Sequence, residues 1–514
     1  MTDLHSAVGN LITGKIAGSS LDKETEQLIR QGTMGGVTLF KDNVADLDQL
    51  LELIDLAHSI APEPFLVAVD QEGGAVQRFD DVITAIPSAM AIGAIADRTA
   101  AMQLISIAAQ QLHWLGVNCN LAPVLDVNSN PLNPIIATRA YGSDPITVSQ
   151  IGDLVSQAYA DQAVLPVGKH FPGHGDTAED SHLALAVAHG DAAALNDREL
   201  LPFARLAHSL PAMLVGHVWL PAYDEKPLPA SLSHAVTTDL LRNQLGFGGF
   251  IMTDDMPVMK AIVDHWGLEE AAVMAVAAGA DNVLISGTVE QIQSVHAALT
   301  KAFQSGVLNQ SQLGIISHRR ANAMQICMSI DKLPLEQRRA LLKNSLKASQ
   351  ELALKVACSS VCLFKGTVAN LSAPFDEWIV LAPAHPRYSL DLFGSLAKHT
   401  PPGGGTIRER RFAVNPDSAE IEDVVTFAAG KKCLLLTYRA LLNKGQLQLA
   451  SRLATEIDPA SIVVACDVPY ELASMSDFAN AIATFDPSEL AMCALAEILL
   501  GKSRATGICP VDVR

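Results

Sequence analysis

Short apolar runs alternate with longer helical stretches over the first part of the chain, and this alternation constrains the fold more than any other feature. Strands that are joined by helices pair in parallel through right-handed crossovers, so the pattern indicates a barrel or a doubly wound sheet. Helices are predicted over residues 99–115, 146–162 and 268–278. Strands are predicted over residues 35–40, 65–70, 118–127, 164–170, 212–219, 248–254 and 280–286.

Polar or ionisable side chains stand at the ends of five of these predicted strands. In a barrel of parallel strands, the carboxyl ends converge on one mouth, and this is where such folds carry their active sites. The five endings therefore favour a TIM-type (β/α)8 barrel over an open sheet. They are V-A-V-D at Asp70, P-V-L-D at Asp126, G-K-H at Lys169 and His170, V-G-H at His217 and I-M-T-D at Asp254.

The chain has 514 residues, which is more than one hydrophobic core usually supports. After the barrel pattern, the sequence becomes charged and helical, and a second set of short apolar runs then begins. We predict a catalytic barrel over residues 1–330, a helical connector over 331–356 and a smaller α/β domain over 357–514. The strands of this second domain lack comparable histidine and carboxylate endings, so we expect the domain to be mainly structural.

Charge and composition exclude several classes of partner and location. A net charge of −19 argues against nucleic acid or an anionic membrane surface, because both require a cationic footprint. The eight cysteines are scattered without a C-x-x-C pair, which predicts reduced core thiols with no metal and no disulfide. No apolar run reaches about 18 residues and the N-terminus lacks a basic leader, so a soluble cytoplasmic protein is expected. The oligomeric state is left open.

One segment, K-H-F-P-G-H-G-D-T-A-E-D-S-H at 169–182, holds three histidines, three acids and a lysine. Its glycines and proline exclude an ordinary helix. The apolar, β-prone run at 164–167 directly before it predicts a buried strand. Lys169 and His170 should therefore stand at the carboxyl end of that strand, with an active-site loop beyond them.

Two further motifs accompany this loop, V-D-Q-E-G-G-A-V-Q-R-F at 69–79 and F-I-M-T-D-D-M at 250–256. Together the three motifs resemble those of glycoside hydrolase family 3, specifically its bacterial β-N-acetylglucosaminidase branch. Ordered motifs of this kind extend over roughly residues 8–300, and the second half resembles the α/β-sandwich domain of some members. The resemblance implies a TIM-type barrel followed by an α/β sandwich. It also implies a cofactor-free, retaining exo-hydrolase of terminal β-linked N-acetylglucosamine that acts on peptidoglycan or chitin fragments.

The resemblance assigns catalytic roles to three residues. Asp254 would attack the anomeric carbon and form a covalent glycosyl-enzyme intermediate, with Asp255 as the competing candidate. His182, supported by Asp180, would protonate the leaving oxygen and later deprotonate water, since its unperturbed pKa of about 6.5 suits acid/base work. The residues expected to bind the sugar are Asp70, Arg139, Lys169 and His170, with His217 as a further candidate at the next strand end. For Asp126 and His174 we expect structural roles.

Three alternatives remain open from the sequence. A metal-dependent barrel hydrolase would use His170, His174, His182, His217 and Asp254 as ligands, although Pro and Gly prevent the helix that would align the first two rings. A non-catalytic sugar-binding module would need neither a nucleophile nor an acid/base loop. A β-N-acetylglucosaminide phosphorylase or another family 3 β-glycosidase could use the same residues, because a neutral histidine repels phosphate less than a glutamate does.

Overall fold

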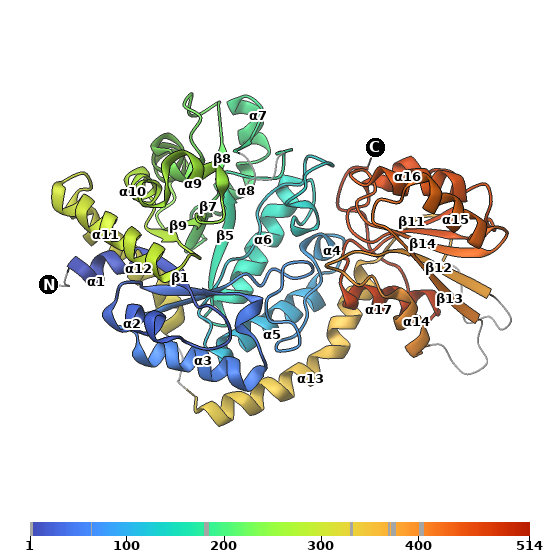
Figure 1. The fold of residues 1–514 in the computed structure, drawn as a ribbon, viewed down its shortest axis with the longest axis horizontal. Helices are drawn as coiled ribbons and strands as arrows, with labels where there is room; N and C mark the ends of the chain where they lie inside the picture. The colour runs from blue at the N-terminus through green and yellow to red at the C-terminus, as the bar shows by residue number, and fades with distance from the viewer. Residues whose placement is uncertain are drawn as a thin grey trace.

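The computed structural model describes residues 4–62, 64–178, 185–328, 333–368, 371, 377–399 and 406–513. Its N-terminal part is a closed barrel of eight parallel strands ringed by helices, and a second α/β unit lies beside it (Figure 1). The predicted TIM-type barrel is thereby confirmed. Around the barrel the strands are β1 (Ile12–Lys15), β10 (Asn282–Leu284), β9 (Phe250–Asp255), β7 (Ala212–Val215), β5 (Leu165–Phe171), β4 (Cys119–Asn120), β3 (Leu66–Val69) and β2 (Gly36–Leu39).

The strand predictions differ from the structure in three places. β1 was not predicted, because I-T-G-K is a short run with an interior glycine and a terminal charge. β4 is shorter than the predicted 118–127, since Pro123 has no N–H for the ladder, and only Val124 pairs again, with Lys169. The predicted strand 212–219 contains β7 and then β8 (Val218–Trp219), which leaves the barrel and pairs with β6 (Ala186–Val187).

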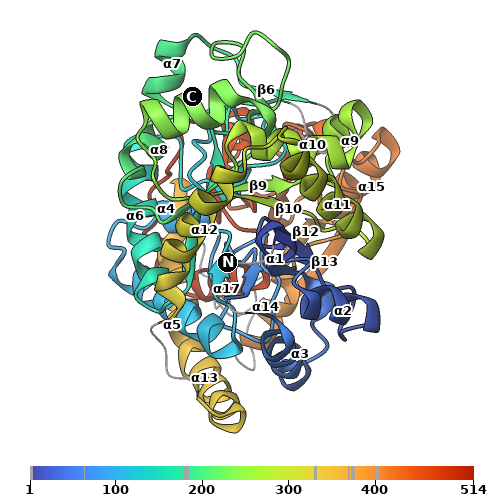
Figure 2. The same cartoon turned by 90° about the vertical axis from the view of Figure 1, so that its left-hand side faces the viewer.

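Helices surround the barrel on its outside (Figure 2). Three were predicted to within two residues, namely α5 (Thr99–Leu115), α6 (Pro145–Ala160) and α10 (Leu268–Ala278). The remaining helices of this part are α1 (Leu4–Gly9), α2 (Lys23–Gln31), α3 (Leu47–Ile60), α4 (Ala89–Gly93), α7 (Ala192–Asp197), α8 (Leu201–Leu206), α9 (Lys260–Trp266), α11 (Val289–Ser305) and α12 (Gln310–Met324). Short 3-10 and π segments are η1 (Lys41–Asn43), η2 (Ala137–Arg139), η3 (Ala230–Leu232), η4 (Ala235–Gln244) and η5 (Gln325–Met328).

The second unit is a six-stranded sheet with helices on both faces, as the predicted α/β sandwich requires. All neighbouring strands are parallel except the pair β11/β16. The order is β11 (Cys362–Lys365), β16 (Asn480–Ala483), β15 (Ile462–Ala465), β14 (Lys432–Thr437), β12 (Glu377–Pro383) and β13 (Thr406–Phe412). Helices α14 (Leu392–His399) and α17 (Glu489–Leu499) pack on one face, and α15 (Ser418–Ala428) and α16 (Lys444–Leu453) pack on the other.

The expectation that these strands lack histidine and carboxylate endings is wrong. His385 follows β12, Asp467 follows β15 and Asp486 follows β16. The sequence pattern had placed Asp467 inside a strand, whereas the ladder between β14 and β15 ends at Ala465. The carboxyl edge of this sheet therefore carries ionisable groups.

The two units contact each other through a long helix and through polar bonds. Helix α13 (Leu335–Ser360) packs against both α5 and α17. The loops after β3 and β4 reach the second unit directly, and a short 3-10 segment, η6 (Tyr470–Met475), lies at this contact. The bonds are Ser88 N to Asp486 Oδ2 (2.9 Å), Asn128 Nδ2 to Tyr470 Oη (2.7 Å) and Arg439 Nη1 to the Pro134 carbonyl (2.7 Å). The limits of 331–356 for the connector stay a proposal.

The eight cysteines are all free thiols, and five of them are buried. Within the described ranges, no helix combines the length and the apolar character that crossing a membrane requires.

Candidate active site

On three barrel strands, the side chains that point into the barrel form a row, and the next residue of each row is a proposed site residue. Along β5, Leu165 and Val167 fill the barrel interior, and the next residue of that row is Lys169. In the same way, Asp70 lies two residues after Ala68 of β3, and Asp254 lies two residues after Met252 of β9. Because side chains alternate along a strand, these three residues lie at the carboxyl mouth above a filled interior.

A buried ion network occupies this mouth. The Lys169 Nζ atom lies 2.7 Å from Asp70 Oδ1 and 2.6 Å from Glu72 Oε1. Arg139 binds Glu72 with two parallel bonds of 2.8 Å each. Burial opposes the ionisation of Glu72, but the charges of Arg139 and Lys169 outweigh it and hold the pKa of Glu72 well below its usual range. The two carboxylates in turn raise the pKa of Lys169 against the effect of burial, so the ammonium stays charged.

The two ring nitrogens of His170 contact an acidic and a basic side chain, those of Asp126 and Arg139. Its Nδ1 lies 2.6 Å from Asp126 Oδ2, and its Nε2 lies 3.1 Å from Arg139 Nη2. Because a guanidinium only donates, Nε2 accepts, and the neutral tautomer carries its proton on Nδ1, directed at Asp126. Burial would raise the pKa of Asp126, but His170 and the backbone N–H of His174 lower it. Asp126 therefore orients His170.

The adjacent acids at the end of β9 lie in different environments. Asp254 Oδ1 accepts the Asp255 backbone N–H at 2.8 Å. Burial works against its ionisation, yet His170 and His217 outweigh this effect and lower the pKa of Asp254 to about 2. Asp255 instead accepts the backbone N–H of Ser286 at 2.9 Å and also its hydroxyl. Burial, with the charge of Asp254 added, raises the pKa of Asp255 to about 6. Asp254 is thus the ionised carboxylate of the pair.

His217 follows β7 and is almost completely buried. Its Nδ1 lies 2.7 Å from the Ser231 hydroxyl, which fixes the plane of the ring. Because β7 pairs with β9 in parallel, His217 lies at the strand end next to the one that carries the proposed nucleophile. The structure therefore gathers Asp254 and the five proposed sugar-binding residues at one mouth: Asp70, Arg139, Lys169, His170 and His217.

The loop after β5 is fixed at its base. His174 Nδ1 lies 2.6 Å from the Thr177 hydroxyl, and burial lowers the pKa of the His174 ring. Asn133 of the neighbouring loop donates to the carbonyls of His174 (2.8 Å) and Thr177 (3.0 Å). The proposed acid/base residues Asp180 and His182 lie outside the described residues, in the gap between 178 and 185.

The metal alternative finds no support in the arrangement of the histidines. Both ring nitrogens of His170 have protein partners, and His174 is bonded to Thr177. Over the described ranges, no group of three or more His, Cys, Asp and Glu side chains is placed to hold a metal ion.

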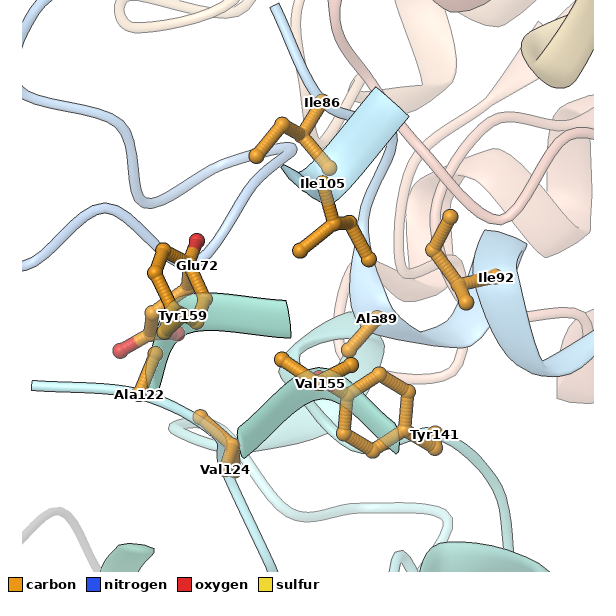
Figure 3. A pocket seen from close by; sticks show the side chains of 10 residues that line it. All are labelled: Glu72, Ile86, Ala89, Ile92, Ile105, Ala122, Val124, Tyr141, Val155 and Tyr159. Atoms are coloured by element: carbon orange, nitrogen blue, oxygen red, sulfur yellow. The ribbon is translucent and has the colours of Figure 1, made fainter. Parts of the chain in front are cut away.

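A small cavity lies behind the ion network (Figure 3). Glu72 and Tyr159 lie together at one side of it, and aliphatic side chains such as Ile105 form much of the remaining wall. Its volume of about 10 Å³ suits one water molecule at most, so it cannot hold a sugar ring.

Glu72 is the site residue that the sequence analysis missed. It stands inside the quoted motif V-D-Q-E-G-G, two positions after Asp70. The glycines after it supply the signal, since Gly73 (φ 106°) and Gly74 (φ 55°) adopt left-handed backbone that other residues rarely adopt. This turn brings the backbone N–H of Glu72 to the Val76 carbonyl at 2.9 Å, which leaves the carboxylate inside the mouth.

Several known proteins resemble this chain in sequence and in fold. The model of the glycosyl hydrolase family 3 N terminal domain matches residues 4–322. Beta-hexosaminidase A of Pseudoalteromonas piscicida is 26% identical over 97% of this chain and 92% of its own, and the beta-hexosaminidase of Alkalilimnicola ehrlichii is 37% identical over 56% and 83%. A family 3 beta-N-acetylglucosaminidase from Paenibacillus sp. str. FPU-7 superposes with a TM-score of 0.86 at 28% identity, covering 100% and 99% of the two chains. The chain therefore belongs to glycosyl hydrolase family 3 and is a glycoside hydrolase.

Proposed function

We propose that this glycoside hydrolase is a retaining exo-β-N-acetylglucosaminidase that removes terminal β-linked N-acetylglucosamine. The observation that carries the proposal is the position of the Asp254 carboxylate, which is half-buried at the barrel mouth and whose pKa is lowered to about 2 by His170 and His217 against the effect of burial. A carboxylate in this state is ionised at neutral pH and fixed by its strand, as a nucleophile requires. The names of the similar proteins from Pseudoalteromonas, Alkalilimnicola and Paenibacillus support the choice of sugar.

In the proposed reaction, Asp254 attacks the anomeric carbon and the bond to the leaving oxygen breaks. His182, oriented by Asp180, gives its proton to that oxygen, so the leaving group departs as a neutral alcohol. Water then enters, His182 takes its proton, and the resulting hydroxide displaces Asp254 from the sugar with overall retention. Asp255 takes no part in the attack, because its carboxylate is engaged by Ser286.

The ion network would bind the hydroxyls of the sugar in the −1 position. Lys169 and Arg139 are donors held in fixed directions by Glu72, and Asp70 is an acceptor whose pKa stays below its usual value because Lys169 and Arg78 outweigh burial. Such preset donors and acceptors orient a sugar without reorganisation of the site. His170 and His217 complete the set of polar side chains near Asp254.

The proposed substrates are small oligosaccharides or muropeptides derived from peptidoglycan or chitin. The proposal includes a cytoplasmic location, no nucleic-acid or membrane partner and no cofactor. The acidic net charge of −19 supports the part that concerns nucleic acid.

A panel of aryl β-glycosides that differ only at the 2-position of the sugar tests the proposal. The 2-acetamido sugar should exceed glucose in kcat/KM by at least about tenfold. A glucoside that is cleaved faster would contradict the assigned sugar. Parallel reactions with and without phosphate separate hydrolysis from phosphorolysis, since a sugar phosphate product would indicate a phosphorylase. Loss of activity after chelation would indicate the metal-dependent alternative.

A further inference from the structure

The carboxyl edge of the second sheet contains a crossover point of the kind where α/β sheets bind ligands. From β12 the chain passes to β13 on one side and then crosses back to β14 on the other side. The order of the parallel strands, β13-β12-β14-β15-β16, is that of doubly wound sheets whose ligand lies between the first and third strands. Loops after β12 and β14 therefore diverge at this edge, and they carry His385, Tyr388 and Tyr438.

These three side chains form an aromatic cluster. The rings of His385 and Tyr388 are stacked with centroids 4.9 Å apart and an interplanar angle of 19°. The Tyr438 ring lies 4.4 Å from His385 and 5.7 Å from Tyr388, tilted to both. His385 and Tyr388 are half-buried, so part of each ring remains accessible. Tyr438 belongs to the buried core on this face of the sheet and Tyr388 packs against that core, so His385 and Tyr388 provide the accessible part of the cluster.

Polar groups border this surface. His385 Nδ1 accepts the backbone N–H groups of Arg387 and Tyr388 at 3.1 Å each, so the proton of the neutral ring lies on Nε2 and can be donated. The exposed guanidinium of Arg387 lies 5.6 Å from the Tyr388 ring centre. Asp467 is fully buried nearby, and its Oδ1 has no hydrogen-bond partner among the described residues. Its charge favours the protonated form of all three rings, although burial has the largest effect on the pKa of each.

The cluster is joined to the rim of the catalytic barrel. Arg439, directly after Tyr438, pairs with Asp467 and donates to the Pro134 carbonyl at 2.7 Å. Pro134 lies in the loop after β4, and the same loop continues to Arg139 of the ion network. The aromatic surface thus stands at the interface between the two units, on the side of the barrel's loops.

We propose that the cluster of His385, Tyr388 and Tyr438, together with Arg387, binds a more distant sugar of the same oligosaccharide whose terminal residue is cleaved in the barrel. This inference rests on the proposed function. The apolar C–H face of a pyranose packs on the electron-rich face of an aromatic ring, while Nε2 of His385 and the Arg387 guanidinium donate to its hydroxyls. Apolar rings with a few convergent donors at a domain interface are the usual composition of such sites.

The test compares two substrates, an aryl β-N-acetylglucosaminide and the β-1,4-linked tetramer of N-acetylglucosamine. Tyr388→Ala should raise KM for the tetramer about tenfold and leave both kinetic constants of the short aryl substrate unchanged. Tyr388→Phe retains the ring and should behave as the wild type. Arg387→Ala should raise KM for the tetramer to a smaller extent, whereas Arg408→Ala, which removes an exposed arginine from β13 of the same domain, should not.

Equal KM values of the wild type and Tyr388→Ala for the tetramer would overturn the inference, and so would equal losses on both substrates. Should Tyr388→Ala unfold, the comparison of Arg387→Ala with Arg408→Ala decides on the same criterion. If the wild type cleaves neither substrate, the proposed function has failed. Calorimetric titration with the tetramer then tests the aromatic site alone. Binding that is weakened in Arg387→Ala and not in Arg408→Ala supports the site. Equal binding by the two variants overturns it.

Discussion

Glu72 and Lys169 form an ion pair of 2.6 Å inside the barrel mouth, with side chains only 3% and 2% exposed. Neither charge can be left alone there, because a buried ion without a partner costs several kcal/mol. Arg139 also pairs with Glu72, and Asp70 also pairs with Lys169, which completes the network. The mouth of the barrel is therefore both the proposed binding site and a point on which the stability of the fold depends.

Replacement of Glu72 by glutamine should lower both stability and activity. The variant leaves Arg139 and Lys169 with one fewer carboxylate, so the free energy of unfolding should fall by about 3 kcal/mol. KM for the N-acetylglucosaminide should rise, because both donors lose the group that fixes their direction. Denaturant unfolding measures the first effect. Glu422→Gln is the matched control: it breaks a surface pair with Arg452 and should change stability by less than about 1 kcal/mol. Equal effects of the two variants would contradict the role of Glu72.

Asp254→Asn should abolish turnover while the fold is kept. An amide fills the same space but cannot form the glycosyl ester, so the loss of kcat should be on the order of ten-thousandfold or more. Asp255→Asn should reduce kcat much less, because Asp255 bonds to Ser286 and does not face the sugar. The two assignments would be reversed if Asp255→Asn were the inactive variant and Asp254→Asn retained near-normal rates.

His182→Ala should affect substrates unequally. A sugar alcohol needs its oxygen protonated as the bond breaks, whereas an activated phenolate departs without help, so the loss should be largest on oligosaccharides. With activated substrates the second step becomes limiting, and a burst of phenolate should precede slow turnover. Asp180→Ala should show the same pattern in milder form. Equal losses on both kinds of substrate, without a burst, would remove His182 from the acid/base role.

Glu471 should make the second unit less stable as the pH rises. Burial raises the pKa of Glu471 to about 7 from the ordinary 4.5, and its Oε2 has no partner among the described residues. Between these two values the unfolded chain ionises and the folded one does not, so the folded state binds more protons and loses stability with increasing pH. Glu471→Gln cannot ionise, and its stability relative to the wild type should increase from pH 4 to pH 8 by on the order of 3 kcal/mol.

Denaturant unfolding across this pH range measures the difference. Glu456→Gln, which removes an exposed carboxylate of the same unit, should show no such trend. A difference between Glu471→Gln and the wild type that does not vary with pH would show that folding does not raise the pKa of this carboxyl.

The sequence predicts the barrel and part of its mouth because both depend on local patterns. The apolar runs that end in Asp70, Lys169 and Asp254 can be recognised in the sequence. Because side chains alternate along a strand, every second residue of such a run points into the barrel, and the last one lies at its mouth. Glu72 was missed because its place depends on the turn at Gly73 and Gly74 and on the approach of Arg139 from another loop. Such a contact between distant segments leaves no periodic trace in the sequence.

The aromatic cluster of the second unit was missed for a related reason. His385 and Tyr438 are separated by two strands and two helices in the chain, and only the crossover around β12 brings their loops together. Individually, each residue is typical of an ordinary loop. Their common surface becomes visible only when the order of the strands is known.

The most direct test of the central claim is mass spectrometry of the protein after brief reaction with an activated 2-acetamido aryl β-glycoside, in the His182→Ala background that slows the second step. The proposed mechanism predicts a mass increase of one N-acetylglucosaminyl residue, located on the peptide that contains Asp254 and absent when Asp254 is replaced by asparagine. An active wild-type enzyme whose His182→Ala variant forms no adduct, or forms one on another residue, would contradict the covalent role of Asp254.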